Sequence, residues 1–293
     1  MAPAATAPKL VVLAADGSVA CLALGTPRGT IELYDGNSGS LIRSAQRVHT
    51  QHATGLAISG DGKVICSCDG GPEAFVHDGR GSHLATVCEI RAIACVAVSL
   101  DGRFIATGSW GPTASIYCVA PLGDCALICV CDSAVFRGGL SSVALSAGGR
   151  LLLAGGEDKS LALFDSHQAE LEEGARLCWH VPNSHRHAVT AVSLVVCSAA
   201  QYGSEGLAAA GLAESDGAAA VVACSSSLDG RLRRRDGRSG VLLATDVETE
   251  DWPLLPMAPF EGARIAYGCT LVRCGVPLCL AQHQLSRGRP CAR

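Results

Sequence analysis

The 293-residue sequence has few aromatic and few charged residues. Phe, Trp and Tyr make up 4% of the chain and Asp, Glu, Lys and Arg 17%, whereas hydrophobic residues reach 48% and Gly numbers 34. Long amphipathic helices carry a charged face, so this composition argues against a mainly helical fold. It favours many short buried strands that are joined by tight turns.

The chain also lacks an excess of either charge and any long apolar run. Lys and Arg total 23 against 27 Asp and Glu, a net charge of -4, so nucleic acid is not an expected partner. The longest nearly apolar stretches, such as Ala188 to Ala200, are shorter than the roughly 18 residues that a spanning helix needs. Membrane insertion is therefore not expected.

Signals of secretion are missing as well. Met1 to Pro8 contains no positive charge, and neither Asn37 nor Asn183 begins an Asn-x-Ser/Thr acceptor. We expect a cytoplasmic protein, with a nuclear location as the alternative. The sixteen Cys are then expected to be reduced, small hydrophobic residues, with these four buried in strands: Cys66, Cys95, Cys178 and Cys224.

No familiar catalytic motif is present. The sequence has no Gly-x-Ser-x-Gly elbow, no phosphate-binding Gly-x-x-x-x-Gly-Lys-Ser/Thr loop and no His-Glu-x-x-His. Cys66-x-Cys68 and Cys129-x-Cys131 do not have the spacing of a zinc knuckle, and no nearby Cys or carboxylate completes a metal site at His185-Arg186-His187. We therefore predict no catalytic, cofactor-binding or metal-binding residue and no cofactor.

An internal repeat is the strongest positive feature. Three segments align without gaps, each an alternating apolar strand, a Ser, a Gly-containing turn and a basic residue: Leu56 to Lys63, Val96 to Arg103 and Val143 to Arg150. Each is followed by a second strand and then by a third strand. The third strand ends at Asp78, Cys118 or Asp165, in each case 17 residues after the turn. This constant register indicates one structural unit that is used several times.

These units resemble the WD repeats, which read as a strand, a Ser-x-Asp-Gly turn, a second strand, another turn and a third strand that ends in Trp-Asp. The terminal dipeptides are Tyr34-Asp35, His77-Asp78, Tyr117-Cys118, Phe164-Asp165 and Arg235-Asp236, so the Trp is absent throughout. Their first three intervals of 43, 40 and 47 residues fit four-stranded blades. The resemblance implies an all-β propeller of four-stranded antiparallel blades, five recognisable and a weak sixth.

The propeller is expected at residues 9–280, with disordered ends at 1–8 and 281–293. The fourth interval, 71 residues long, contains an inserted loop at 199–218. A sixth blade is expected from Arg264 to Leu280, completed by a strand from Lys9 to Leu13. An open arc covered by another chain, and a piece of a larger propeller, are the alternatives.

The resemblance implies a non-catalytic scaffold that binds other proteins through the propeller rim and face, either alone or within a larger complex. The alternative is a propeller hydrolase or lyase that uses loop residues. Binding is expected on the loops before each first strand and on the turns between second and third strands, at six residues: His49, Arg91, Arg137, Asp158, His185 and Asp229.

Two features of the family pattern remain open. Its members carry a network of a pre-strand His, a Ser or Thr, a turn Asp and the Trp, and here the unit with His185 and Asp229 ends in Arg235. A partly satisfied polar network stabilises little, so reduced rigidity is expected. The basic run Arg231 to Arg235 is either a functional basic cluster or a charged, exposed strand edge.

Overall fold

The structure is a computed structural model of the whole chain. It describes residues 10–13, 21–26, 29–35, 38, 40–45, 48–51, 53–120, 124–132, 135–166, 174–197, 220–248, 254–260, 264–269 and 279–284. The expected insertion at 199–218 and the ends at 1–8 and 285–293 lie outside these residues.

Six antiparallel sheets follow one another along the chain, each with its strands in sequence order. The first three sheets, blades 1 to 3, are β1 (Leu10–Leu13), β2 (Cys21–Gly25), β3 (Ile31–Asp35) and β4 (Leu41–Ala45); β5 (Gly55–Ile58), β6 (Val64–Cys68), β7 (Glu73–Asp78) and β8 (His83–Cys88); and β9 (Ile93–Val98), β10 (Phe104–Ser109), β11 (Thr113–Val119) and β12 (Cys125–Asp132). Blades 4 to 6 are β13 (Leu140–Leu145), β14 (Leu151–Gly156), β15 (Leu161–Asp165) and β16 (Arg176–Val181); β17 (Val189–Cys197), β18 (Ala220–Ser227), β19 (Arg231–Asp236) and β20 (Leu242–Glu248); and β21 (Leu254–Phe260), β22 (Arg264–Cys269) and β23 (Cys279–Gln284).

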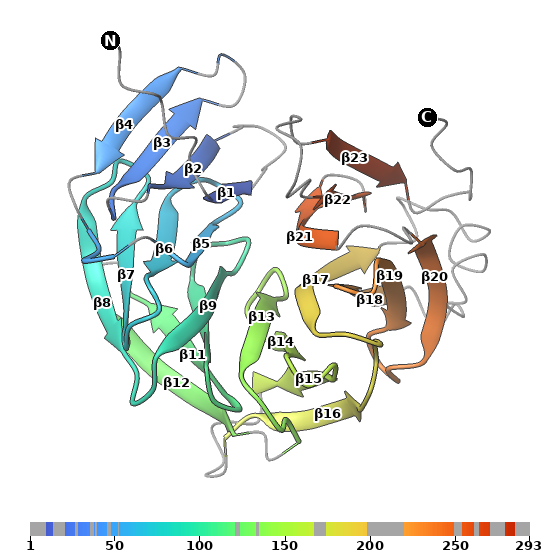
Figure 1. Ribbon diagram of the computed structural model, residues 1–293. Helices are drawn as coiled ribbons and strands as arrows, with labels where there is room; N and C mark the ends of the chain where they lie inside the picture. Colours follow the sequence, from blue (N-terminus) through green and yellow to red (C-terminus); the bar gives the residue numbers. More distant parts are fainter. Residues whose placement is uncertain are drawn as a thin grey trace.

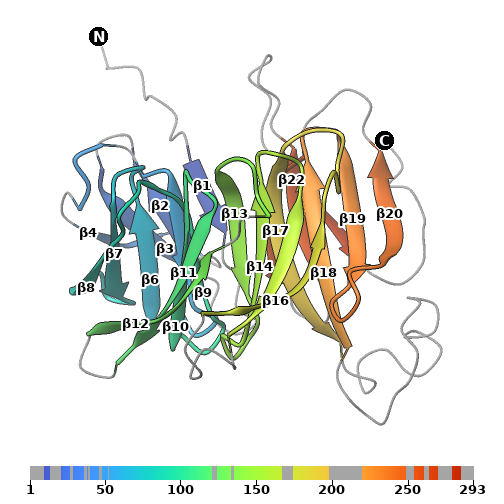
Figure 2. The same ribbon diagram turned by 90° about the horizontal axis from the view of Figure 1, so that it is seen from below.

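The blades are arranged around a common axis (Figure 1). The first strand of each blade lies innermost, and the blades stand side by side with their strands running from one rim to the other (Figure 2). Consecutive blades pack through these inner strands, β5 against β9, β9 against β13 and β13 against β17. This arrangement confirms the predicted propeller and its five four-stranded blades.

Burial follows from the position of each strand within its blade. The second strands face a neighbouring blade on both sides, so Leu152, Leu153 and Ala154 are fully buried. The fourth strands are outermost, and Leu41 and Leu127 there are more than half exposed. Strands that are buried on both faces read as continuous apolar runs, which accounts for the hydrophobic and weakly charged composition.

In blades 2 and 3 the turn after the first strand is held by its own side chains. Ser59 Oγ donates to Asp61 Oδ1 at 2.7 Å, and Ser99 Oγ donates to Asp101 Oδ1 at 2.6 Å. Gly102 follows with a φ of 69°, in the left-handed region that favours Gly. The repeated Ser-x-Asp-Gly sequence is therefore a requirement of turn geometry.

The sixth blade differs from the prediction. Its three strands begin at Leu254, and the N-terminal strand β1 pairs with β2 in blade 1, so the expected completion of blade 6 by Lys9 to Leu13 is wrong. Pro256 lies at a register shift of the edge strand β21, where a missing N–H breaks no ladder bond. Strand β23 continues to Gln284, beyond the predicted boundary at 280.

Blade 6 packs extensively only against blade 5 among the strands that the structure describes, through contacts of β21 with β17 and β18. Blades 1 and 6 are thus the two ends of the series of packed blades. No membrane-spanning helix is found in the described part of the chain.

The prediction for the cysteines holds in part. The ten Cys whose side chains are described are all free thiols, and Cys66 and Cys224 are buried. Cys95 is half-buried, and Cys178 is exposed, contrary to the prediction, because β16 is the outermost strand of blade 4.

Tight packing between blades 4 and 5 can be tested at Gly155. A Cβ at this position would lie 2.6 Å from Val189 Cγ1 and 2.9 Å from Val192 Cγ1. We predict that Gly155→Ala lowers the free energy of unfolding in urea by about 1–3 kcal/mol.

The matched control is Gly148→Ala, whose Cβ would meet no atom within 4 Å. This variant should keep or slightly raise the stability, because Ala restricts the unfolded chain. Equal stability of the two variants would show that blades 4 and 5 are loosely packed.

Candidate functional site

Two kinds of loop meet at one rim of the propeller. The first kind precedes the first strand of each blade, and the second joins its second and third strands. We call them together the rim belt; in blades 2 to 5 it comprises the loops 48–51, 89–92, 135–139 and 182–188 and the turns 69–72, 110–112, 157–159 and 228–230.

Backbone hydrogen bonds connect the rim belt within and between blades. Within blades, Trp110 N donates to Ala92 O at 2.9 Å and Glu157 N to Gly139 O at 3.0 Å. From one blade to the next, His49 N donates to Gly29 O at 2.9 Å, Ile93 N to Gly71 O at 2.7 Å, and His185 N to Lys159 O at 3.3 Å. The loops are thereby fixed to their neighbours, and side chains on them are held in place.

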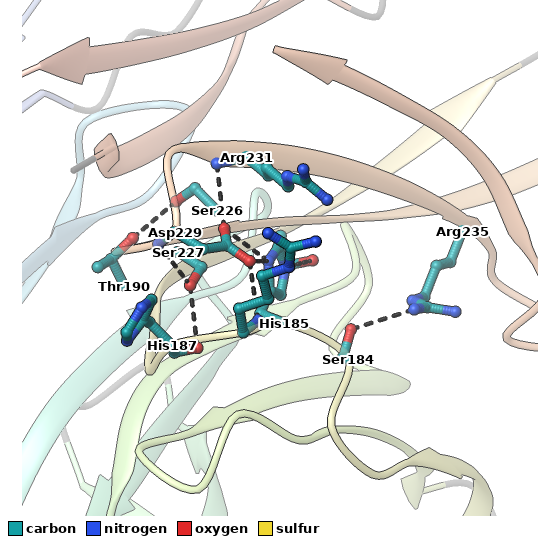
Figure 3. Close-up of polar contacts among 11 residues, drawn as sticks. Ser184, His185, His187, Thr190, Ser226, Ser227, Asp229, Arg231 and Arg235 are labelled. Atoms are coloured by element: carbon teal, nitrogen blue, oxygen red, sulfur yellow. Dashed lines mark hydrogen bonds and ion pairs between the residues drawn. The ribbon is translucent and has the colours of Figure 1, made fainter. Parts of the chain in front are cut away.

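Blade 5 contains a network of His185, Asp229 and Ser225, of which Figure 3 labels the first two. His185 Nδ1 lies 3.2 Å from both carboxylate oxygens of Asp229, and its Nε2 lies 2.8 Å from Ser225 Oγ. The same carboxylate accepts the backbone N–H groups of Arg186 at 2.9 Å and Arg231 at 3.1 Å. His185 therefore ties the loop to the second strand, while Asp229 ties it to the turn.

Burial determines the charge of these groups. It lowers the pKa of His185 to about 4, although Asp229 acts in the opposite direction. Burial alone would raise the pKa of Asp229, but the N–H of Arg186 and the imidazole of His185 outweigh it and hold that pKa below its usual value. At neutral pH the network consists of a neutral imidazole and an ionised carboxylate.

The order Ser225, His185, Asp229 is that of a hydrolytic triad, but Ser225 is 1% exposed. A substrate carbonyl cannot reach a hydroxyl at that depth. The network therefore acts as an internal support of the rim belt.

Blades 2 and 3 hold equivalent contacts at equal spacing. His49 Nε2 lies 2.8 Å from Ser67 Oγ, 18 residues further on. Glu89 accepts a hydrogen bond from Thr107 Oγ1 at 2.5 Å, also 18 residues on, and one from Tyr117 Oη at 2.9 Å. Glu89 thus takes in blade 3 the place that His49 has in blade 2.

Blade 4 fills the same three positions with apolar residues. Phe136, Ala154 and Phe164 have the same spacing of 18 and 28 residues, and all three are buried in one cluster. We call His49, Glu89, Phe136 and His185 the anchor residues, one from the loop of each blade.

The residue after the anchor is held in the same way in blades 4 and 5. Asp158 Oδ2 accepts the backbone N–H of Arg137 at 2.8 Å, as Asp229 accepts that of Arg186. Asp158 also accepts the N–H of Ser160 at 3.1 Å. The apolar anchor of blade 4 therefore leaves the position of Arg137 intact.

The third-strand position, which is Trp in the family, differs from blade to blade. In blade 5, Arg235 is 8% exposed and donates to Gly240 O and to Ser184 Oγ, away from Ser225. Strand β19 is paired on both sides, by β18 and β20, so the suggestion that Arg231 to Arg235 form an exposed strand edge is wrong.

In blade 2 the same position is His77, which is 4% exposed and whose Nδ1 has no hydrogen-bond partner among the described residues. Its ring lies edge-on to that of His83, with 5.7 Å between centroids. Burial, followed by the nearby His83 and His49, lowers the pKa of His77 to about 4, although Asp78 acts in the opposite direction. His77 is therefore neutral in the folded protein at pH 7.

The predicted site residues divide into two pairs and two single residues. His185 contacts Asp229, and Arg137 contacts Asp158 through its backbone. His49 bonds to Ser67, which sequence reasoning did not single out, and lies 3.7 Å from Asp69 Oδ2. Arg91 is exposed at the rim belt, and its side chain lies over Gly111.

Sequence reasoning missed Glu89, Thr107 and Asp69. A signal was available for the first two, because the spacings of 18 and 28 residues from His49 recur from Glu89. Asp69 has no such signal, since it lies two residues before the expected turn position at Gly71. Among the described residues, no three His, Cys, Asp or Glu are grouped to hold a metal ion.

Comparison with known proteins gives two similarities. Residues 81–118 and 133–165 match the family model "WD domain, G-beta repeat". The fold is similar to the crystal structure of Chaetomium thermophilum Sqt1 bound to the N-terminus of the ribosomal protein L10, with a TM-score of 0.63 and 22% identity over 84% of this chain. The alignment spans 64% of the Sqt1 chain. No curated protein matches by sequence.

The buried imidazole of His77 predicts a loss of stability in weak acid. Its folded-state pKa of about 4 is below the usual 6.5, so its stabilising contribution is complete above about pH 6.5 and declines as the pH falls toward 4. We predict that the urea midpoint falls between pH 7 and pH 5, and that His77→Phe reduces this fall. Phe occupies the equivalent position in blade 4.

The control is His187→Gln, which changes an exposed imidazole on blade 5, away from His77, and should keep the wild-type pH dependence. Identical pH dependence of His77→Phe and the wild-type protein would contradict the assignment.

The contacts of Glu89 predict a coupled effect in blade 3. Glu89→Ala leaves the hydroxyls of Thr107 and Tyr117 without their acceptor, at a cost of about 1–3 kcal/mol. The triple variant Glu89→Phe, Thr107→Ala, Tyr117→Phe copies the apolar set of blade 4. The triple variant leaves no hydroxyl unsatisfied. Its free energy of unfolding, measured by chemical denaturation, should therefore be higher than that of Glu89→Ala. If Glu89→Ala were the more stable variant, the three positions of blade 3 would not be equivalent in packing to those of blade 4.

Proposed function

Because this chain is a divergent member of the WD-repeat β-propeller family, we propose that it is a non-catalytic scaffold that binds other proteins through its rim belt. One observation carries the proposal. The backbone of the rim belt is hydrogen-bonded from blade to blade, while Arg91, Trp110, Arg137 and Arg186 project from it exposed. Because the backbone is already fixed, binding has to order only the side chains, and this smaller entropy cost favours affinity.

The family and the solved neighbour support this proposal. Sqt1, a propeller of the same fold, is bound to a terminal segment of another protein. For the present chain we propose protein partners in the cytoplasm, within a larger complex.

The enzymatic alternative has less support. Its best constellation among the described residues is the network of Ser225, His185 and Asp229, and each of its contacts supports the loop from within.

Site-specific photo-crosslinking tests the proposal. A photoreactive amino acid is placed at Glu157 or His187, both exposed in the rim belt, or at Arg80 or Arg103, both exposed on the opposite rim. We predict that the rim-belt positions trap a reproducible set of proteins in cells and that the opposite rim does not.

Trapping from the opposite rim alone would place the binding surface there and remove the proposed role of the rim belt. Absence of any specific adduct from all four positions would refute the scaffold function itself.

A further inference from the structure

The exposed charged residues on the rim belt of blades 3 to 5 are mostly basic. Arg91, Arg137, Lys159 and Arg186 are exposed and basic, while Glu157 is the exposed acidic residue of the same loops and turns among those described. No ion pair involving these four basic residues occurs among the described residues. This contrasts with the whole chain, which has a net charge of -4.

The other acidic groups of these loops are directed inward. Asp158 and Asp229 accept backbone N–H groups of the neighbouring loops, and Glu89 accepts the hydroxyls of Thr107 and Tyr117. Their carboxylates are engaged below the surface. The charge that a partner meets first is therefore positive.

The basic residues form one continuous stretch of the rim. Ala92, next to Arg91, accepts the N–H of Trp110, and a Cβ on Gly139 would lie 2.8 Å from the carbonyl oxygen of Trp110. Trp110 therefore lies against the loop that carries Arg137.

The stretch then continues into blade 5. Asp158 holds the N–H of Arg137, and its neighbour Lys159 accepts the N–H of His185, which precedes Arg186. We call Arg91, Trp110, Arg137, Lys159 and Arg186 the basic sector.

Large apolar side chains are exposed within the same stretch. Trp110 is 55% exposed, Ile90 is fully exposed and Leu228 is 49% exposed. Exposed aromatic and Arg residues together are the composition that protein interfaces favour. A partner that fits must therefore present both negative charge and apolar surface.

We infer that the basic sector binds an acidic, extended segment of a partner protein, with an apolar side chain of that segment placed against Trp110. The inference deepens the proposed scaffold function and rests on it. Carboxylates of the segment pair with Arg91 on one side of Trp110 and with Arg137 and Arg186 on the other, because the Arg guanidinium binds carboxylates in a bidentate manner.

Fluorescence polarisation with three pools of labelled dodecapeptides tests the inference. In the first pool, Asp or Glu alternates with Leu, Phe or Trp; in the second, Lys or Arg replaces the acids; in the third, Gly and Ser replace the apolar residues. The folded full-length chain should bind the first pool about tenfold more tightly than either of the others, and less tightly at high salt.

Variants then locate the binding. Arg137→Glu and Arg186→Glu should each weaken binding of the first pool by about five- to tenfold. The matched control is Arg80→Glu, an exposed Arg on the opposite rim. Trp110→Ala should weaken binding comparably, whereas Leu100→Ala, which truncates an exposed apolar residue of the opposite rim, should not. Unchanged unfolding midpoints verify that each variant is folded.

Equal binding of the acidic and basic pools, or equal affinities of rim-belt and control variants, would overturn the inference. So would tighter binding to a labelled single-stranded dodecathymidylate than to the first pool, because the sector would then recognise phosphate. If the peptides fail while crosslinkers at Glu157 and His187 still trap proteins, the acidic segment is refuted and the scaffold function stands.

Discussion

The contact between each entering loop and the sheet that it enters is the constraint on which the rim of this propeller depends. A loop between blades has no ladder of its own, so its polar groups and its position must be satisfied by neighbours. The anchor residues provide this in three chemistries: an imidazole at His49 and His185, a carboxylate at Glu89 and an aromatic ring at Phe136. Each is matched by the second-strand residue that faces it, a hydroxyl in the polar blades and Ala154 in the apolar one.

Much of the fold was predictable because its cause is local. Ser59 and Asp61 close their turn within a few residues, and an apolar strand buried on both faces is visible as a run. Blade 6 was less predictable from the sequence, because its strands do not repeat the register of the other blades and the first of them contains prolines. The N-terminal strand β1 pairs with its immediate neighbour β2 rather than reaching across the ring, and the prolines of β21 are tolerated because that strand is an edge.

The candidate site was predictable to a smaller extent, for a physical reason. Sequence comparison seeks the same residue type at a repeated position, whereas the structure needs a matched set. Glu89 is chemically unlike His49, yet it too pairs with a hydroxyl 18 residues further on, and it accepts a second hydrogen bond from Tyr117. In blade 4 the set has no polar member, so no motif could reveal Phe136. Identity of residues is lost between blades while complementarity within each blade is kept.

This separation of support from surface explains how a degraded signature is compatible with an ordered rim belt, the surface proposed to bind partners. In blades 4 and 5 the anchor residue lies inside. The side chain of the residue after it is exposed, while its backbone N–H donates to an Asp of the turn. Asp158 holds Arg137 above an aromatic anchor, and Asp229 holds Arg186 above an imidazole. The interior can therefore change its chemistry without moving the exposed Arg. In the proposed function a partner contacts the outer residues, so binding and stability depend on adjacent but different positions, and the absence of Trp from the terminal dipeptides leaves the described rim belt in order.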